Sequence, residues 1–583
     1  MRHSILGILL ALITGAVSKP PLLKKPPTVQ VKNGTYIGTH SNSYNQDFFL
    51  GIPYAQPPVK NLRFNTAQSL NTTWTGKKTA NSYSAACIGY GTDNAGYKNT
   101  SEDCLYLNIV RPSERRWKLP VLVWIHGGGL VEGSAIDQRY NLSFIVHQSE
   151  AIGKPIIGIS LNYRLGALGF LNSDEVAKTG NTNLGFKDQR LALRWVQENI
   201  PAFGGDPEQV TIWGESAGAF SVGAHLTAFG GRDDRLFRGA IMDSGNPVFY
   251  LPVFPAQYFQ PSYEALLKMT RCNNSADGLE CLRQVPIAEL SKVFHASPSL
   301  WSGFTPSKDG NFIQGSGSEL LSKGKFVHVP ILIGTNTDEG TYFASKDPTP
   351  KNISSDAEFI SYLQGNNQHL PTPFIQEVLR AYPDVPSEGI PGVPTLPASY
   401  RPGYPYGSQW RRLAAYCGDS VIIANKRWTS QIWSSAGLDV YSYRFNIVPA
   451  SIQGVFGASH VQEIPFAFYN HNGIGYNKEN MSPWNGTEEP FEDKGADYAE
   501  AARLMSSFWV SFVHNQDPNS FGRGGCSIDN RSVPLWPTYT KGGKNGTNFV
   551  FSSAFEFYLE PDNCRFNAIN LLMSRNEKSY TQE

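Results

Sequence analysis

The chain has 583 residues and a nearly balanced charge, with 50 Lys plus Arg against 49 Asp plus Glu. This balance gives no basic surface for nucleic acid, so we expect no nucleic-acid partner. With 40% hydrophobic and 17% charged residues, the composition is that of a globular protein and excludes a disordered chain. The length exceeds that of a usual domain, but α/β enzymes often reach it as one unit with insertions.

The N-terminus has the features of an export signal. A basic start at Arg2 and His3 precedes apolar residues 5–13 and small residues 16–18. The apolar run is too short to span a bilayer, so we expect residues 1–18 to be a removed signal peptide and residues 19–27 a flexible extension. No later run suits a membrane helix, and the polar C-terminus lacks a lipid-anchor signal. We therefore predict a secreted, extracellular protein without a stable membrane anchor.

Glycosylation triplets and cysteines fit an exported chain. Seven cysteines suggest disulfides and one unpaired thiol, because neighbouring cysteines would close short loops. No zinc motif or phosphate-binding loop is present in the sequence, so we expect no metal and no cofactor. The candidate pairs are Cys87 with Cys104, Cys272 with Cys281 and Cys526 with Cys564, which leaves Cys417. The Asn-x-Ser/Thr triplets begin at Asn33, Asn71, Asn99, Asn141, Asn273, Asn352, Asn480, Asn485, Asn530 and Asn545.

Short runs of Val, Ile and Leu recur along the chain, each followed by glycine or polar residues. Continuous apolar runs indicate strands buried on both faces, and helices are predicted between them, notably over residues 183–200. This pattern predicts a doubly wound α/β fold with a mostly parallel sheet, whose reactive groups collect at the carboxyl ends of the strands. The predicted strands cover residues 119–125, 154–161, 210–213, 237–242, 329–334 and 439–445.

Two stretches look like insertions into one domain that covers residues 28–583. Residues near 250–325 and 345–435 carry helical and loop patterns, and residues 383–407 are rich in Pro and Gly. Strand signals resume after residue 435, so we interpret 383–407 as an irregular loop over the core rather than as a linker.

The segment TIWGESAGAF contains Gly-x-Ser-x-Gly, centred on Ser216, between a predicted strand and a predicted helix. A sharp turn there exposes the serine hydroxyl, and small neighbours let the backbone approach closely. The run His126-Gly127-Gly128-Gly129 follows an upstream strand, where unobstructed N–H groups can bind an oxyanion. The alternative for the glycine run is a flexible turn, and we interpret His126 as structural.

A serine nucleophile needs a base and an acid, expected in the chain order Ser, acid, His. Asp338 and Glu339 close a predicted strand and are both candidates for the acid. The histidines beyond them are His369, His460, His471 and His514. We favour His460 because it lies in the turn-rich segment GASHVQEIPFAF after a strand.

The segments FGGDPEQVTIWGESAG, SEDCLYLNI, HGGG, NTDEGTYF and SHVQEIPF resemble signatures of the type-B carboxylesterase/lipase family of α/β-hydrolases. The resemblance runs from about residue 28 to near the C-terminus. It implies an α/β-hydrolase fold with insertions over the strand ends, Ser216 as nucleophile, Glu339 as acid and His460 as base. It further implies oxyanion N–H groups on Gly128, Gly129 and Ala217.

The resemblance also implies several supporting features. Ser244 corresponds to a serine that supports the acid, although a helix cap or turn residue is an equal alternative, and Glu215 is a further supporting residue. Structural ion pairs are implied between Arg63 and Glu102 and between Arg190 and Asp206. The same comparison pairs Cys87 with Cys104 and Cys272 with Cys281.

Three departures from the family pattern affect the predicted specificity. Val461 follows His460 where glycine is usual, and Leu130 follows the glycine run where an aromatic residue is common. The loop between Cys87 and Cys104 is short and polar and contains no Trp, whereas fungal lipases have a long amphipathic lid there.

We therefore predict a secreted serine carboxylic-ester hydrolase that forms an acyl-enzyme on Ser216 and prefers short- to medium-chain esters. A triacylglycerol lipase is the alternative, with residues 383–407 covering the site. A choline esterase is disfavoured by the missing Trp. A non-catalytic adhesion protein is disfavoured because all three triad residues are present.

Overall fold

The computed structural model describes residues 25–114, 118–249, 252–345, 352–366, 370–392, 395–450, 452, 454–476, 489–521, 527–528, 531–540, 546–552 and 557–578. The predicted signal peptide, Cys526 and the triplets at Asn480, Asn485, Asn530 and Asn545 lie outside these residues. No helix among the described residues is long and apolar enough to cross a membrane.

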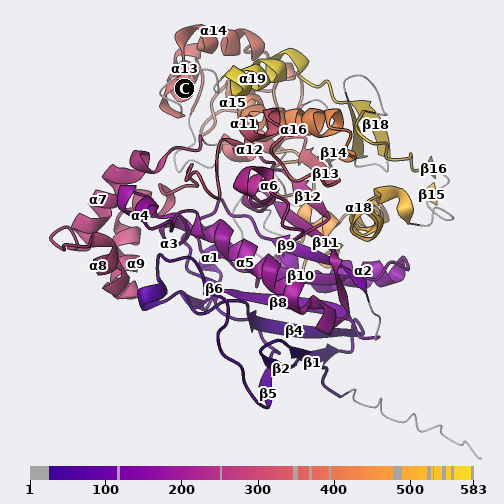
Figure 1. Cartoon of the computed structure of the whole chain (residues 1–583). Helices are drawn as coiled ribbons and strands as arrows, with labels where there is room; N and C mark the ends of the chain where they lie inside the picture. The colour runs from indigo at the N-terminus through magenta and orange to yellow at the C-terminus, as the bar shows by residue number, and fades with distance from the viewer. Residues whose placement is uncertain are drawn as a thin grey trace, which may run out of the picture.

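An 11-stranded sheet forms the centre of the molecule (Figure 1). From β10 to β17 each strand runs parallel to its neighbour, while β3, β4, β8 and β18 pair antiparallel at the two sides. In spatial order the strands are β18 (Phe557–Pro561), β17 (Thr547–Ser552), β14 (Val440–Asn446), β13 (Ile331–Asn336), β12 (Gly239–Asp243), β11 (Gly205–Glu215), β9 (Leu119–Ile125), β10 (Ile157–Leu161), β8 (Tyr106–Pro112), β4 (Gln46–Pro53) and β3 (Thr39–Ser41). The predicted α/β class is therefore confirmed.

The parallel strands are apolar on both faces, which is why they form the middle of the sheet. Every residue of β9, β10 and β12 is buried. Helices α2 (Leu142–Ala151) and α18 (Ala496–Asn515) contribute to the core on one face. Helices α5 (Leu184–Asn199), α6 (Ala217–Gly231) and α16 (Ala424–Ser435) contribute to the core on the other. The turns at the carboxyl ends of the strands are thereby held between two packed layers.

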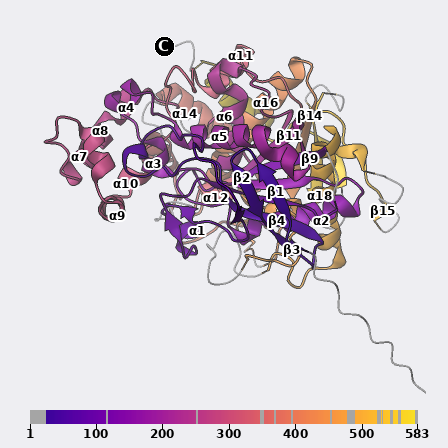
Figure 2. The ribbon, with the colours of Figure 1, turned by 60° about the horizontal axis from the view of Figure 1, so that its bottom comes forward.

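The two predicted insertions fold mainly as helices. Figure 1 shows α7, α8 and α9 together on one side of the molecule and α13, α14 and α15 at the top beside the C-terminal α19, and Figure 2 shows the first group from a second direction. Within residues 383–407 the described part contains only the short turn η5 (Pro386–Glu388). The helices are α7 (Gln260–Met269), α8 (Gly278–Gln284), α9 (Ile287–Ala296), α10 (Ser299–Ser302), α11 (Gly317–Ser322), α13 (Asp356–Asn366), α14 (Thr372–Ala381), α15 (Trp410–Gly418) and α19 (Phe566–Lys578).

A small sheet and short elements complete the described structure. The small sheet consists of β1 (Thr28–Val31), β2 (Gly34–Ile37) and β5 (Lys77–Thr79) and lies at the end of the molecule away from α14 (Figure 1). Disulfides join Cys87 to Cys104 and Cys272 to Cys281. Cys417 is buried, with its Sγ 3.2 Å from the Tyr362 hydroxyl, and Cys564 is exposed.

Candidate active site

Ser216 lies in the sharp turn between β11 and α6, in an unusual backbone conformation. Its φ of 54° and ψ of −123° are strained for a residue with a side chain, and the surrounding structure holds them in place. The Ser216 N–H donates to the carbonyl of Asp243 on the neighbouring strand (2.9 Å). A Cβ on Gly218 would lie 2.0 Å from the Ile125 carbonyl oxygen, so only glycine allows this turn to pack against β9.

His460 lies between Ser216, the predicted nucleophile, and Glu339, the predicted acid. It lies in the turn between β14 and α17 (Ile464–Ala467), and only 1% of its surface is exposed. Its Nε2 is 2.8 Å from the Ser216 Oγ, and its Nδ1 is 2.7 Å from Glu339 Oε2. Residues that are 121 and 244 positions away in the chain thus contact one imidazole ring.

Glu339 begins α12 (Glu339–Phe343), directly after the turn that follows β13, and is fully buried. The Ser244 Oγ donates to its Oε1 (2.5 Å), and the backbone N–H of Asn336 donates to the same oxygen (2.7 Å). Both donors stabilise the carboxylate and fix its direction. Ser244 was expected either to support the acid or to be a helix cap or turn residue, and the structure shows that its Oγ contacts Glu339 directly.

The neighbouring Asp338, the other candidate for the acid, points elsewhere. Its Oδ2 accepts a hydrogen bond from the Ala458 N–H (2.8 Å), so it holds the turn that precedes His460. Burial raises the pKa of Asp338 to about 7. Of the other histidines considered, His471 is exposed and His514 contacts Asn515, while His369 lies outside the described residues.

The glycine run forms the loop after β9. Gly128 and Gly129 have φ values of 94° and 62°, and a Cβ on Gly128 would lie 2.3 Å from the Glu132 carbonyl oxygen. Ala217 begins α6, where the first N–H groups of a helix have no acceptor within the helix. His126 stacks on Tyr163 with ring centroids 4.5 Å apart, and burial lowers its pKa to about 4. A neutral, stacked His126 fits the structural role expected from the sequence.

Further buried carboxyl groups lie beside the triad residues. Glu215 Oε1 is 3.4 Å from His460 Nε2, and burial followed by the charges of Glu463 and Glu339 raises the Glu215 pKa well above its usual value. Glu463 accepts a hydrogen bond from Asn336 Nδ2 (2.6 Å), and burial followed by the charges of Asp243 and Glu339 raises the Glu463 pKa well above its usual value. Although Glu463 lies in the segment SHVQEIPF, its place beside the triad residues could not be predicted, because the order of residues in the chain does not show how deeply a side chain is buried.

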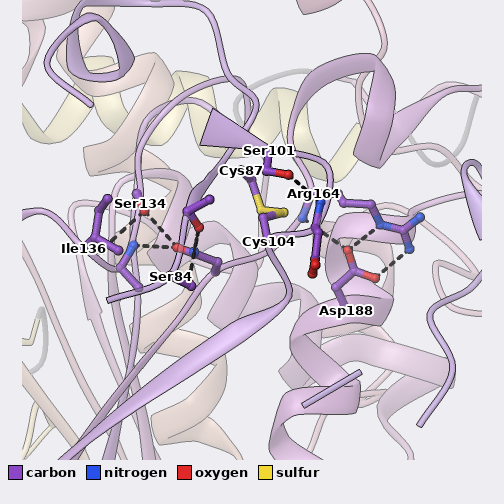
Figure 3. Close-up of a disulfide and its surroundings, with 12 residues drawn as sticks. Ser84, Cys87, Ser101, Cys104, Ser134, Ile136, Arg164 and Asp188 are labelled. Atoms are coloured by element: carbon purple, nitrogen blue, oxygen red, sulfur yellow. Dashed lines mark hydrogen bonds and ion pairs between the residues drawn. A yellow bond between two sulfur atoms is a disulfide. The ribbon is translucent and has the colours of Figure 1, made fainter. Parts of the chain in front are cut away.

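The short loop between Cys87 and Cys104 lies against the loop of the glycine run and is joined to it by hydrogen bonds. The N–H of Asp93 donates to Glu132 Oε2 (2.9 Å), and Gly133 N–H donates to Asn94 Oδ1 (2.8 Å). Figure 3 shows the disulfide between the segment of Ser134 and the ion pair of Arg164 with Asp188, which are 2.6 Å apart. The disulfide and the hydrogen bonds of Asp93 and Asn94 therefore hold this loop against the loop of the glycine run.

The structure contains one of the two predicted ion pairs, and the prediction of the other was wrong. Arg63 contacts Glu102 through two hydrogen bonds of 2.5 and 2.7 Å. Arg190 pairs instead with Asp234 (2.5 Å). Asp206 turns back onto its own segment, where it accepts from the Glu208 N–H (3.0 Å).

Comparison with known proteins identifies the family of the chain. The model of the carboxylesterase family matches residues 25–566. The chain belongs to the carboxylesterase family. Among curated relatives of this carboxylesterase, Lipase 4 of Diutina rugosa is 31% identical over 579 residues, covering 92% of this chain and 94% of that protein. Secreted lipase 1 of Botryotinia fuckeliana is 34% identical over 529 residues, covering 85% of this chain and 84% of that protein.

A solved structure shows the same fold. The crystal structure of Aspergillus niger EstA has a TM-score of 0.78 and 28% sequence identity, and the match covers 94% of this carboxylesterase and 98% of that chain. The family match and these relatives identify the chain as a carboxylic ester hydrolase. Among the described residues of the carboxylesterase, no group of three or more His, Cys, Asp or Glu is arranged to hold a metal ion.

Proposed function

We propose that this carboxylesterase hydrolyses esters through an acyl-enzyme on Ser216, with His460 as the base and Glu339 as the acid. The observation that carries the proposal is the pair of contacts made by His460, 2.8 Å to the serine and 2.7 Å to the carboxylate. A serine hydroxyl is a weak nucleophile, and a base within hydrogen-bond reach activates it.

The geometry supports the following proton steps. The Ser216 hydroxyl donates to His460 Nε2, so His460 receives the proton as the oxygen attacks the ester carbonyl. The Nδ1–H donates to Glu339, which orients the ring and stabilises its charged form. His460 then protonates the leaving alcohol, and water releases the acid by the same route. The N–H groups of Gly128, Gly129 and Ala217 would hold the oxyanion in both stages.

The fastened loop supports a preference for dispersed esters of short to medium acyl chain. A lid that opens at a lipid surface has to separate from the body of the enzyme. Here the loop carries a disulfide, and the contacts from Asp93 and Asn94 join it to the loop of the glycine run. The energy of these hydrogen bonds opposes such an opening, while the disulfide keeps the ends of the loop together.

A triacylglycerol lipase remains the second candidate because of the relatives. A protein from Gibberella zeae described as secreted triacylglycerol lipase LIP1 is 32% identical over 527 residues. Residues 383–407, which are mostly irregular where the structure describes them, could serve as a cover in place of the short loop. Relatives described as secreted also support export of this chain, as the N-terminal sequence predicts.

The test is the rate of hydrolysis across p-nitrophenyl esters from acetyl to palmitoyl, with wild type, Ser216→Ala and Ser322→Ala. Ser322 is an exposed serine of α11 and controls for the loss of a hydroxyl. We expect a maximum at short to medium chains that Ser216→Ala lowers by at least about 10³-fold and Ser322→Ala leaves in place. A maximum at palmitoyl that appears above the solubility limit would favour the lipase. Full activity of Ser216→Ala would refute the proposed nucleophile.

A further inference from the structure

The loop between Cys87 and Cys104, which we call the disulfide loop, contains a buried polar side chain, Asn94. This residue lies in the short helix α1 (Thr92–Ala95), and 7% of its surface is exposed. Its Nδ2 donates to the Cys87 carbonyl (3.2 Å), and its Oδ1 accepts from the N–H of Gly133 (2.8 Å). A buried amide thus joins the disulfide loop to a segment 39 positions later in the chain.

Two further hydrogen bonds join the disulfide loop to the same segment. The backbone N–H of Asp93 donates to Glu132 Oε2 (2.9 Å). The backbone N–H of Tyr90 donates to the Val131 carbonyl (3.2 Å). Together with the contact to Gly133, these bonds mean that three consecutive residues, 131–133, are each bound by the disulfide loop.

Two glycines of the disulfide loop make room for these contacts. A Cβ on Gly89 would lie 2.7 Å from both Nδ2 and Oδ1 of Asn94, and a Cβ on Gly91 would lie 1.9 Å from Glu132 Oε2. Gly91 is extended, with a φ of 170°, and Gly89 is not left-handed, so the backbone conformation does not require glycine at either position. The space that Asn94 and Glu132 occupy explains both glycines.

The segment bound by the disulfide loop packs directly on the loop of the glycine run. The Glu132 N–H donates to the Gly128 carbonyl (3.1 Å), and a Cβ on Gly133 would lie 2.8 Å from the Gly127 carbonyl oxygen. A Cβ on Gly127 would in turn lie 3.2 Å from the Cβ of Ser216. Closely packed groups transmit a displacement to their neighbours, so a shift of Gly133 should move the glycine run relative to the serine.

The N–H groups of the glycine run depend on their surroundings for their direction. Gly128 and Gly129 are both left-handed and have no side chains that could fix them. Oxyanion donors are effective only at hydrogen-bond distance, about 2.7–3.1 Å from the developing charge. Because residues 131–133 continue the loop of the glycine run, the contacts that hold this segment also affect the oxyanion geometry.

We propose that Asn94 is a positioning residue for the oxyanion N–H groups. By accepting from Gly133, it holds the glycine run at the distance from Ser216 that the tetrahedral intermediate requires. The inference rests on the proposed acyl-enzyme function and gives the disulfide loop a part in it. Asn94 acts through Gly133 and not on the ester itself, so its loss should weaken binding of the oxyanion more than binding of the substrate.

The experiment uses a trifluoromethyl ketone, which adds to an active serine and places a negative oxygen in the oxyanion site. For Asn94→Ala we expect kcat/KM on p-nitrophenyl butyrate to fall by about 10–100-fold, mainly in kcat, and the Ki of the ketone to rise by a similar factor. Asn94→Asp keeps an acceptor for the Gly133 N–H and should retain more of the affinity for the ketone. Gly89→Ala, whose methyl group displaces the Asn94 amide, should raise the Ki as well.

Asn199→Ala is a matched control for the loss of a buried amide. Asn199 ends α5, and 3% of its surface is exposed. It accepts from the Lys32 N–H (3.2 Å) and donates to the Trp195 carbonyl (2.9 Å), ahead of the amino end of β11. Its removal should lower the melting temperature, as that of Asn94 does, but leave kcat and the Ki of the ketone unchanged.

The outcomes separate this inference from the proposed function. An unchanged Ki in Asn94→Ala, or an equal rise in Asn199→Ala, would overturn the inference while Ser216-dependent hydrolysis stands. If Asn94→Ala does not fold, Gly89→Ala decides in its place, because it removes no polar group. Absence of any Ser216-dependent hydrolysis in wild type would refute the proposed function, and this inference with it.

Discussion

The carboxyl edge of the sheet and the helical insertion over residues 352–435 keep their shapes by different means. At the edge, Ser216, Ser244 and Val461 all have left-handed backbones, and buried carboxyl groups lie close together. In the insertion, α14 and α15 pack through an apolar core with ordinary helical geometry. The edge therefore contains strained backbone and buried carboxyl groups, whereas the helical region is held by apolar packing together with ion pairs such as Arg412 with Asp356 (2.7 Å).

The two regions meet closely where α12 packs against α15. Helix α12, which carries Glu339, packs against α15 so tightly that a Cβ on Gly340 would lie 1.8 Å from the Ala414 carbonyl oxygen. The insertion thus forms the wall that positions the acid. Substitutions in the edge, in the insertion and at this contact should therefore differ in whether they lower activity, stability or both.

The largest effect is expected in the edge, from Glu339→Gln. The amide keeps the shape of the side chain but removes the charge that orients and stabilises the imidazole, so we expect kcat to fall by about 10²–10⁴-fold. The melting temperature should stay within a few degrees of wild type. Steady-state kinetics on p-nitrophenyl butyrate and circular dichroism measure the two properties. A kcat within 10-fold of wild type would remove Glu339 from the proposed mechanism.

In the insertion, Leu413→Ala should produce the opposite result. Leu413 is fully buried in α15, and the cavity left by its side chain should lower the free energy of unfolding by about 2–5 kcal/mol. Activity per folded molecule should change little, because Leu413 belongs to the apolar cluster that joins α13, α14, α15 and α19. Urea denaturation, with kinetics at a temperature where the variant is folded, tests this. A large loss of kcat with normal stability would mean that the two regions are not separate.

At the contact itself, Gly340→Ala should change both properties. The added methyl group meets the backbone of α15, and overpacking of this kind costs roughly 1–3 kcal/mol of stability. Because Glu339 is the adjacent residue, its distance to His460 changes as well, and kcat should fall more than 10-fold. Gly365→Ala is a matched control in α13, where an added Cβ meets no atom within 4 Å. Equal behaviour of the two alanine variants would contradict the close contact.

The smallest effect on activity is expected from Asp338→Asn, which should instead change the pH dependence of stability. Burial raises the Asp338 pKa from 3.8 to about 7, so between these values the folded protein binds a proton that the unfolded chain has lost. Its contribution is complete below about pH 4 and is lost as the pH rises through 7. At ~1.4 kcal/mol per pKa unit, the asparagine variant should reduce this decline by about 3–4 kcal/mol between pH 4.5 and 8. Urea denaturation at pH 4.5, 6 and 8 measures it, and an identical slope in both proteins would contradict the shift.

The sequence predicts the fold class and the central strands, because uninterrupted apolar runs such as residues 119–125 are typical of buried parallel strands. Motif and chain order favour Ser216 and His460 and leave Asp338 and Glu339 as alternatives for the acid, and the family resemblance favours Glu339. The sequence does not reveal the depth of Glu463 or the contact of Arg190 with Asp234, because these depend on how distant turns pack. The left-handed conformation of Val461 is equally hidden, since nothing in a valine indicates positive φ.

Because the turn at Ser216 is strained, the loss of activity on heating should depend on the stability of the central sheet. Ser216 keeps its backbone conformation only while the Asp243 carbonyl accepts its N–H and β9 presses against Gly218. A strained residue relaxes when its surroundings loosen. Thermal inactivation and melting of the sheet should therefore occur as one event, and ester hydrolysis in a crude extract would report the fraction of molecules that are still folded.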